Sequence, residues 1–374
     1  MREIRRHIHR NPELAFRETD TAAYISSKLR EVGVEAQTEV AGTGLLAETG
    51  GADSSLIVGL RADMDALPIT EETALSYASI NPGIMHACGH DGHVAMLLGA
   101  AVLLQQMDLP GRVRLLFQPA EEKGNGAVRM IEAGAIDGLA AIFSGHIDTH
   151  FPTGFFTVDK GIVCAYADSF TIKVKGRSGH AARPHESKDA ILAVAGLITS
   201  LQSLVAREVD PNHAAVLTVG RVEAGDTHNV IAGDAVIEGT IRSTHPDARK
   251  RMLSGLSRIV QGNAILYGVE ADLVFPEALP AVINHPSAAV SAAKAAALVI
   301  SEDNVLSQGR SSLGGEDFAF YLEEINGCLV RFGAKISDKT GPAHSPTFNF
   351  DEDVLPLGAA WYAQVAMQFL QENT

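Results

Sequence analysis

The feature that most constrains the fold is an alternation of short apolar runs with longer helical patterns in the first part of the chain. The runs SLIVGL (55–60), RVRLLF (112–117) and AAIFSG (140–145) have the composition of buried strands. Between them, HVAMLLGAAVLLQQM (93–107) and GAVRMIEAG (126–134) have helical periodicity. Strands that alternate with helices predict βαβ units, so we expect a doubly wound α/β domain with a mixed sheet.

The pattern changes near Asp168. Four alternating runs, SFTIKVKG, AAVLTVG, AVIEGTIRS and VEADLVF, predict half-exposed strands, and two long helical patterns lie between them. Four strands and two helices predict an α+β unit with an antiparallel sheet and helices on one face. We therefore expect a discontinuous first domain, residues 1–167 and 279–374, and an inserted domain at residues 168–278.

The charge balance excludes several kinds of partner. The chain has 30 Lys+Arg against 45 Asp+Glu, a net charge of −15, so it lacks the basic surface that binds nucleic acid or an anionic membrane. The start, MREIRRHIHRNPEL, alternates charges where a signal peptide needs an apolar run, and no run of about 18 apolar residues is evident. We expect a cytoplasmic protein whose three distant cysteines, Cys88, Cys164 and Cys328, are reduced.

Polar clusters follow each of the three predicted strands of the first domain. Ligands of open α/β sheets bind outside the carboxyl ends of the strands, so we expect these clusters to converge on one crevice. The clusters are Arg61 with Asp63 and Asp65, Gln118 with Glu121 and Glu122, and His146 with Asp148 and His150.

The densest polar segment is MHACGHDGH, Met85 to His93, which directly precedes a predicted helix. A helix N-terminus favours a thiolate, the form of cysteine that binds metal. The segment predicts a metal role for at least two of its polar residues. The candidates are His86, Cys88, His90, Asp91 and His93.

The neighbouring carboxylates of Glu121 and Glu122 permit a division of labour, in which one binds metal and the other moves protons. His146 and His344 are isolated in the sequence, and their candidacy depends on the need to complete a site that the other ligands leave unfilled. For His180, Asn229 and Arg242 of the inserted segment, the residues leave a structural and a functional role equally open. An imidazole can donate to an oxyanion, and a guanidinium matches a carboxylate.

Several motifs together, in order along nearly the whole chain, resemble the amidohydrolase branch of the dinuclear metallopeptidases. That branch includes hippurate hydrolase, N-acyl-amino-acid amidohydrolases and indoleacetyl-amino-acid hydrolases. The resemblance implies two divalent ions per chain (Zn, Mn, Co or Ni), held by the first domain, and an inserted lid or dimerisation domain. The motifs are RRHIHRNPELAFRE, LRADMDALPI, MHACGHDGH, FQPAEE, GHAARPH, THNVI, GGEDFAFY and GPAHSPTF.

The resemblance also assigns roles to residues. It implies that Glu121 is the general base, that Asp63 and Asp65 support the ligands, and that His180 reaches the active site of a partner subunit. Asn229 and Arg242 would hold the substrate. The implied metal ligands are Cys88, His90, Glu122, His146 and His344.

The chain departs from the family pattern at three places. Ser144-Gly145-His146 replaces the usual Gly-Leu-His. The segment HIDTHFPTG replaces the more usual proline-rich continuation, so His150 becomes a competing ligand candidate. Lys123 adds a cation beside the predicted base, and Cys164 stands where a small residue without a thiol is expected. The sequence suggests no mechanism for Lys123 or Cys164.

The sequence therefore predicts metal-assisted hydrolysis of N-acyl amino acids by a homodimer or higher oligomer. A dipeptidase or carboxypeptidase on the same scaffold is the alternative within enzymes. A binding protein that captures an amino-acid derivative and one structural metal is the alternative outside them.

Overall fold

The computed structural model describes residues 1–51, 55–309, 311–336 and 340–374. The chain forms two compact units, each of which has most of its residue contacts within itself. Unit 1 comprises Met1–Val163, Val282–Arg310 and Glu316–Thr374, and unit 2 comprises Cys164–Ala281 with Ser311–Gly315. The stretch 168–278, predicted as an insertion, falls inside unit 2.

Unit 1 is built on an eight-stranded mixed sheet of order β1-β2-β4-β3-β5-β17-β6-β16. Its centre is parallel: β4 (Arg112–Gln118), β3 (Ile57–Asp63), β5 (Leu139–Pro152) and β17 (Gly327–Lys335) run in one direction. The carboxyl ends of these strands therefore share one edge of the sheet. The flanking strands are β1 (Ala36–Val40), β2 (Gly44–Gly50), β6 (Phe156–Thr157) and β16 (Val305–Leu306).

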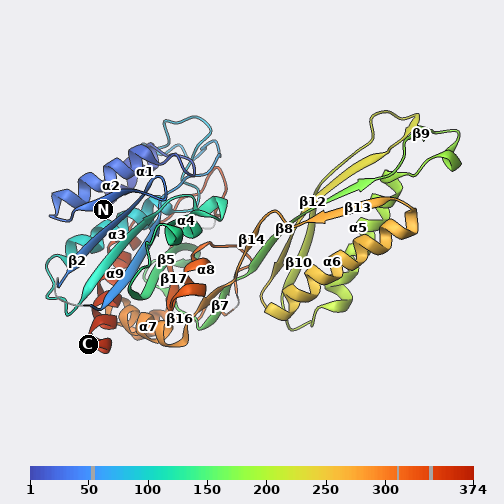
Figure 1. Cartoon of the computed structure of the whole chain (residues 1–374). Helices are drawn as coiled ribbons and strands as arrows, with labels where there is room; N and C mark the ends of the chain where they lie inside the picture. The colour runs from blue at the N-terminus through green and yellow to red at the C-terminus, as the bar shows by residue number, and fades with distance from the viewer. Residues whose placement is uncertain (52–54, 310, 337–339) are drawn as a thin grey trace. The chain divides into compact units, whose positions relative to one another are not determined.

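Helices cover both faces of this sheet, as Figure 1 shows. The buried side chains of α3 (His90–Leu104) and α9 (Val354–Asn373) form one core with alternate residues of the central strands. On the other face, α4 (Gly126–Glu132) packs with α8 (Phe318–Glu324). The predicted doubly wound α/β fold with a mixed sheet is confirmed. The other helices of unit 1 are α1 (Arg2–Arg10), α2 (Thr19–Glu31) and α7 (Pro286–Ile300), and a two-stranded sheet pairs β15 (Val282–Asn284) with β7 (Gly161–Cys164).

Two of the predicted strands are longer than their apolar runs. The strand predicted at 55–60 extends to Asp63, and the strand predicted at 140–145 extends to Pro152. The first extension was missed because it contains Arg61, a charge that is buried only because carboxylates on either side neutralise it. His146 therefore lies inside a strand and not after one.

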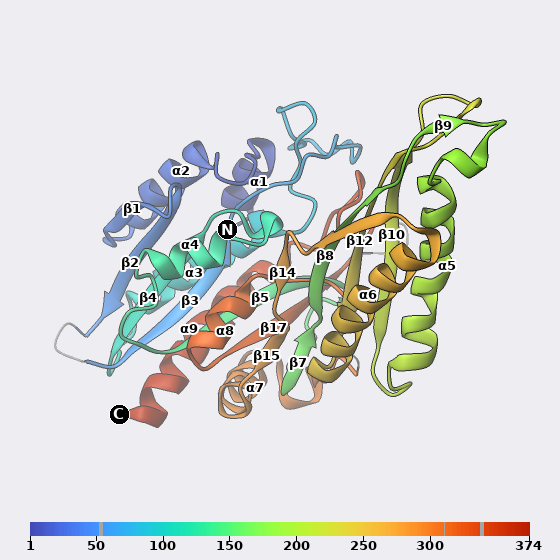
Figure 2. The same ribbon diagram turned by 45° about the vertical axis from the view of Figure 1, so that its right-hand side comes forward.

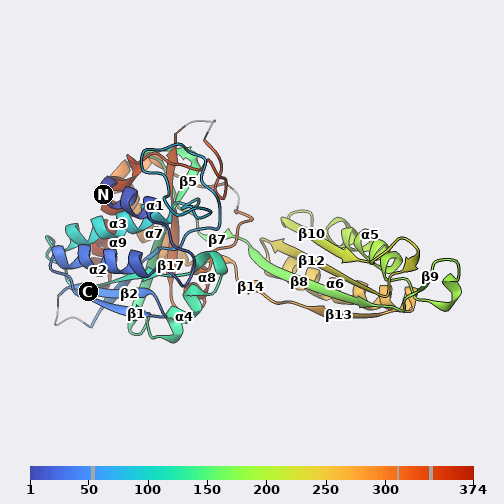
Figure 3. The same ribbon diagram turned by 90° about the horizontal axis from the view of Figure 1, so that it is seen from above.

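Unit 2 is an antiparallel sheet of order β10-β12-β8-β13 with two helices on one face (Figure 2). The helices α5 (Ala190–Glu208) and α6 (Pro246–Tyr267) form a separate core with inward side chains such as Phe170 and Ile237. The two-residue strand β14 (Ala278–Leu279) also pairs with β8, which adds a short strand to the four predicted. The long strands, seen from above in Figure 3, are β8 (Tyr166–Lys175), β10 (Ala215–Ala224), β12 (Asp234–Ser243) and β13 (Glu270–Val274), and β9 (Gly179–His180) pairs with β11 (Val230–Ile231).

The helix α5 is long and mostly apolar, although Thr, Ser and Gln interrupt its apolar residues. By length and composition alone, Ala190–Glu208 would be long and apolar enough to cross a membrane. Its side chains at Leu197, Leu201 and Leu204 are fully buried in the core of unit 2. This burial is typical of a core helix in a globular domain, since an apolar stripe of this kind needs a sheet to cover it.

Candidate metal centre

The carboxyl edge of the parallel strands brings the predicted ligands together. Asp63 is the last residue of β3, and Gln118 is the last residue of β4. Glu121 and Glu122 follow in a short 3-10 helix, Glu121–Lys123. His146 lies on β5, the other neighbour of β3 in the sheet. Side chains from segments far apart in the sequence thus meet at one edge, as the sheet geometry predicts.

Among the described residues, four overlapping groups that contain a predicted ligand each bring three potential ligand atoms within 4.8 Å of one another at this edge. Together they contain Glu121 and all five of the predicted ligands. The groups are Cys88 with His90 and His146, Cys88 with Glu122 and His344, His90 with Glu121 and Glu122, and Asp63 with His90 and His93.

Individual distances show how tight the cluster is. The Sγ atom of Cys88 lies 3.6 Å from Nε2 of His146. Nε2 of His344 lies 3.2 Å from Oε1 of Glu122, which in turn lies 3.9 Å from Nε2 of His90. Soft sulfur, imidazole nitrogen and carboxylate oxygen within such distances form a donor set suited to Zn and its neighbours in the first transition series.

The outer nitrogen of two histidines is fixed by a backbone carbonyl, which leaves the inner nitrogen free for a ligand. His90 donates from Nδ1 to the carbonyl of Asp65 at 2.9 Å, and His146 donates from Nδ1 to the carbonyl of Ile147 at 2.7 Å. Nε2 of His90 is buried and has no hydrogen-bond partner among the described residues. An unsatisfied buried nitrogen aimed at other donors is what a metal ligand requires, so the residues fit divalent metal.

The surroundings of Cys88 correct one step of the sequence argument. The helix N-terminus was expected to favour a thiolate, but burial raises the pKa of the Cys88 thiol to about 12. Desolvation disfavours the charged form because it loses its water, and it outweighs the hydrogen bond with His90, which lowers the pKa. A divalent cation reverses the balance, since a coordinating thiol is deprotonated outright.

The turn that carries Glu121 and Glu122 is held by its backbone. The two oxygens of the Asp65 carboxylate accept the N–H groups of Glu121 and Glu122, each at 3.1 Å. Burial, together with the carboxylates of Glu316 and Glu122, raises the pKa of Glu121 well above its ordinary value. A carboxylate with raised proton affinity beside metal-type donors is suited to move a proton.

The acidic pair Glu316 and Asp317, which the sequence offered only as part of a motif, completes the region behind Glu121. Arg61 donates to Asp63 at 2.6 Å and to Asp317 at 3.0 Å, and its guanidinium lies 3.1 Å from Glu316. All four side chains are almost fully buried. The motif GGED carried the signal, but the sequence did not show that its acids face an arginine in β3.

In the cysteine-containing segment, His93 and Asp91 have structural partners, whereas neither ring nitrogen of His86 has a hydrogen-bond partner among the described residues. Both ring nitrogens of His93 are used, Nδ1 by Asp63 at 2.6 Å and Nε2 by the N–H of Ile147 at 2.9 Å. Asp91 accepts from Arg5 at 2.8 Å. His86 lies in none of the groups described above, and burial lowers its pKa to about 3. Of the five candidates in this segment, the structure leaves Cys88 and His90 with a donor atom that faces several other donors.

His150 is not brought to the cluster. Its ring is 82% exposed and its Nδ1 lies 2.7 Å from Oδ1 of Asp148. The described residues place Lys123 on the surface and Cys164 in the interior, and the structure suggests no chemical role for either.

The predicted residues of unit 2 fall at two ends of its sheet. His180 pairs with Val230 across β9 and β11, and the carbonyl of Asn229 accepts the N–H of Ala181 at 3.1 Å, so His180 and Asn229 are neighbours. Arg242 lies near the other end of β12. A strand of this length spans roughly 30 Å, so His180 and Arg242 of one chain are too far apart to contact one small substrate.

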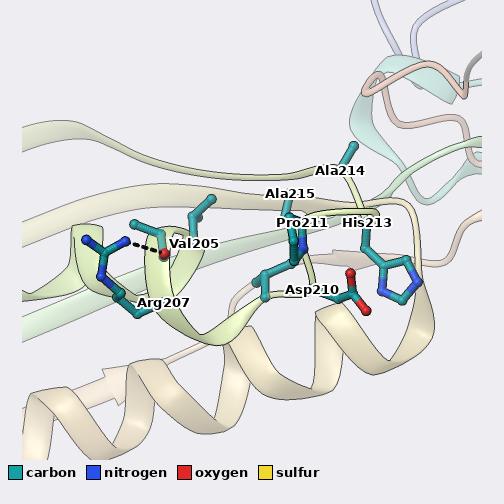
Figure 4. A pocket seen from close by; sticks show the side chains of 9 residues that line it. Val205, Arg207, Asp210, Pro211, His213, Ala214 and Ala215 are labelled. Carbon is teal, nitrogen blue, oxygen red and sulfur yellow. Dashed lines mark hydrogen bonds between the residues drawn. The ribbon is translucent and has the colours of Figure 1, made fainter.

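Unit 2 also contains a surface cavity of about 460 Å³ where α5 meets β10. Figure 4 shows Asp210 and His213 at this cavity, and Arg207 bonded to a nearby backbone carbonyl. The His213 ring stacks on His245 at 3.7 Å. No predicted site residue lines the cavity, so it is separate from the metal centre.

A catalytic centre of the metallohydrolase class is therefore defined by the sheet edge and its donors. The chain belongs to the peptidase family M20/M25/M40, whose model matches residues 59–368. It is accordingly an enzyme that cleaves amide bonds, which excludes the alternative of a non-enzymatic binding protein.

Two curated relatives and a solved structure are similar to this chain over almost its whole length. The N-acetyl-L-cysteine deacetylase of Bacillus subtilis is 38% identical and covers 99% of this chain and 88% of the relative. Thermostable carboxypeptidase 1 of Saccharolobus solfataricus is also 38% identical, over 98% of this chain and 94% of the relative. The crystal structure of the YXEP protein of Bacillus subtilis, a dinuclear metal binding peptidase of the M20 family, has a TM-score of 0.86 at 36% identity and covers 99% of this chain and 97% of that one.

Replacing Cys88 tests the metal centre directly. In the cobalt-substituted protein, Cys88→Ser should remove the near-ultraviolet charge-transfer band of a thiolate bound to cobalt. Cys328→Ser is the matched control, because this second buried thiol lies outside the described ligand groups and should leave the band unchanged. A band that survives Cys88→Ser would contradict sulfur ligation by this residue.

Proposed function

We propose that this chain is a metal-dependent amidohydrolase that cleaves N-acyl amino acids into a carboxylic acid and a free amino acid. The observation that carries the proposal is the placement of Glu121, with its raised pKa, beside a cluster of thiol, imidazole and carboxylate donors. The name of the relative N-acetyl-L-cysteine deacetylase supports the substrate class.

The metal would be held by five side chains of unit 1. Divalent cations at these positions would supply the Lewis acidity that activates water and polarises the scissile carbonyl. Similarity to the YXEP protein, a dinuclear metal binding peptidase, supports a pair of ions, with Zn, Mn, Co or Ni as the candidates. The proposed ligands are Cys88, His90, Glu122, His146 and His344.

The chain's own groups then move protons and hold the substrate. Glu121 takes a proton from water and delivers it to the leaving amine. Asp63 and Asp65 keep the ligands in place through their hydrogen bonds to His93 and to the turn at Glu121. In unit 2, His180 would donate to the oxyanion, while Asn229 and Arg242 would bind the carboxylate of the amino acid.

The separation of these residues along β12 supports a site shared between subunits. Because Arg242 and His180 lie near opposite ends of the sheet, both can serve one substrate only if they come from different chains. We therefore propose a homodimer, placed in the cytoplasm, in which His180 and Asn229 enter the partner's site. Such exchange is compatible with two-fold symmetry, where each chain gives what it receives.

A carboxypeptidase or dipeptidase on the same scaffold is the second candidate. The name thermostable carboxypeptidase 1, borne by a relative as similar as the deacetylase, favours it. Both activities use the same hydrolytic step and a free carboxylate in the substrate, so they differ in the acyl group alone.

A substrate panel separates the two candidates. We expect faster release of methionine from N-acetyl-L-methionine than from alanyl-methionine, measured chromatographically with Zn, Mn and Co in turn. Faster release from the dipeptide would favour the peptidase, and no release from either compound or from other N-acyl amino acids would contradict the proposal.

The role of Glu121 is tested by Glu121→Gln, which keeps the size of the side chain and removes its basicity. We expect turnover to fall by roughly 10²- to 10⁴-fold, the contribution typical of a general base. Metal content, measured by elemental analysis, should stay the same because the proposed ligands are intact. Turnover within about tenfold of the wild type would show that another group is the base.

Mixing two inactive variants tests the shared site. Glu121→Gln and His180→Ala should each be inactive, yet subunit exchange creates one intact site in every mixed dimer. Random exchange would restore about a quarter of the wild-type turnover. If both groups serve their own chain, the mixture will remain inactive.

A further inference from the structure

Glu18, the residue before α2, is a buried carboxylate that faces no cation among the described residues. Its side chain is 0% exposed. One oxygen, Oε1, accepts the N–H of Ala120 at 3.0 Å, and the other, Oε2, accepts the hydroxyl of Thr43 at 2.5 Å. A buried carboxylate without a counter-charge is unfavourable, and burial raises the pKa of Glu18 accordingly.

The Glu18 side chain does not support its own helix. Glu18 occupies the N-cap position of α2, where a carboxylate commonly accepts the first free N–H groups, but no side-chain cap bond is formed. The carboxylate reaches instead to Ala120, a residue 102 positions further along the chain. The Glu18 carboxylate therefore binds the backbone of the segment that directly precedes Glu121.

Ala120 has an unusual backbone. Its φ of 57° lies in the left-handed region, which residues other than glycine rarely adopt. Ala120 is the first of three successive residues whose N–H groups are each accepted by a carboxylate. Glu18 accepts the first N–H, and Asp65 accepts those of Glu121 and Glu122. Glu18 thus holds the strained end of the turn.

The other side of the turn leaves little room for relaxation. A Cβ atom added to Gly126 would lie 1.8 Å from the carbonyl oxygen of Pro119, so the start of α4 packs directly on the turn. The N–H of Gly126 donates to the carbonyl of Ala120 at 3.3 Å. A rotation at Ala120 would therefore be transmitted to Glu121 rather than absorbed by the loop.

The orientation of the Glu121 carboxylate depends on this turn more than that of the Glu122 carboxylate does. The Glu122 carboxylate lies 3.2 Å from His344. The Glu121 carboxylate accepts no hydrogen bond from a described residue, and Nε2 of His90 lies 3.8 Å from it. The direction of Glu121 is thus set mainly by the backbone that carries it.

We propose that Glu18 is a positioning residue for Glu121, because its bond to the Ala120 N–H fixes the turn that aims the Glu121 carboxylate. The inference rests on the proposed function, in which Glu121 moves the proton. Removing the Glu18 carboxylate should impair proton transfer more than metal binding or substrate binding. The essential property of Glu18 is an acceptor oxygen at Ala120, not its charge.

Three variants, assayed as full-length metal-loaded enzyme on N-acetyl-L-methionine, test this. Glu18→Ala should lower kcat by about 10- to 100-fold, since a misplacement of about 1 Å at a catalytic group has effects of that order. KM should stay within about threefold, and metal content should be unchanged. Glu18→Gln should restore kcat to within about threefold of the wild type, since its amide oxygen can accept from Ala120 while its amide nitrogen donates to Thr43.

Thr43→Val is the matched control. It removes the other bond of Glu18 and leaves the bond to Ala120, so kcat should stay close to that of the wild type. If Thr43→Val lowers kcat as much as Glu18→Ala does, Glu18 has only a packing role and the inference is overturned. An unchanged kcat in Glu18→Ala would also overturn it. Where Glu18→Ala does not fold, Glu18→Asp replaces it, and an unchanged kcat in that shorter carboxylate also overturns the inference.

Glu121→Gln in the same assay distinguishes a failure of the proposed function from a failure of the inference about Glu18. If Glu121→Gln stays active, the proposed base is wrong. If Glu121→Gln is inactive while the Glu18 variants keep the wild-type kcat, the base is supported and the positioning role of Glu18 is rejected.

Discussion

The hydrogen bonds of Asp65 hold the metal centre together. Its carboxylate accepts the backbone N–H groups of Glu121 and Glu122, and its carbonyl accepts from His90. A single residue after β3 thereby joins the turn that follows β4 to the first residue of α3. Backbone acceptors and donors are rigid, so these bonds fix the turn and the His90 ring that carry proposed ligands.

The edge of the sheet in unit 1 contains a cluster of buried charges, whereas the rest of the core is mostly apolar. Arg61 lies among Asp63, Glu316 and Asp317, and Asp317 also accepts from Gln118 and from the N–H of Ala127. Burial raises the pKa of Asp317 to about 7, so desolvation outweighs the attraction of the arginine. Apolar side chains could stabilise this region equally well. The acids and the arginine are better understood as the support of a reactive carboxylate than as a source of stability.

Apolar periodicity and the position of polar clusters were sufficient to predict the α/β class of unit 1 and the sheet and helices of unit 2. They failed where a charge enters a strand, as at Arg61, because the partners of Arg61 come from distant segments. The same limit applies to the site. The motif around Cys88 pointed to the proposed ligands, whereas the contact of Glu18 depends on the turn after β4. The contact of Glu316 with Arg61 likewise joins distant segments of the chain. The proton affinity of the metal-free Cys88 thiol could not be predicted, because the sequence does not show how far the sulfur is desolvated.

The high proton affinity of Cys88 also bears on the reactivity of its sulfur. Sulfur reacts with oxidants and electrophiles as the thiolate, and burial disfavours that form at Cys88 by raising the pKa of the thiol to about 12. Cys164 and Cys328 are buried, so none of the three cysteines offers an exposed thiolate. The environment that raises the proton affinity of the Cys88 sulfur, a proposed metal ligand, therefore also lowers its reactivity, because the protonated thiol is the less reactive form.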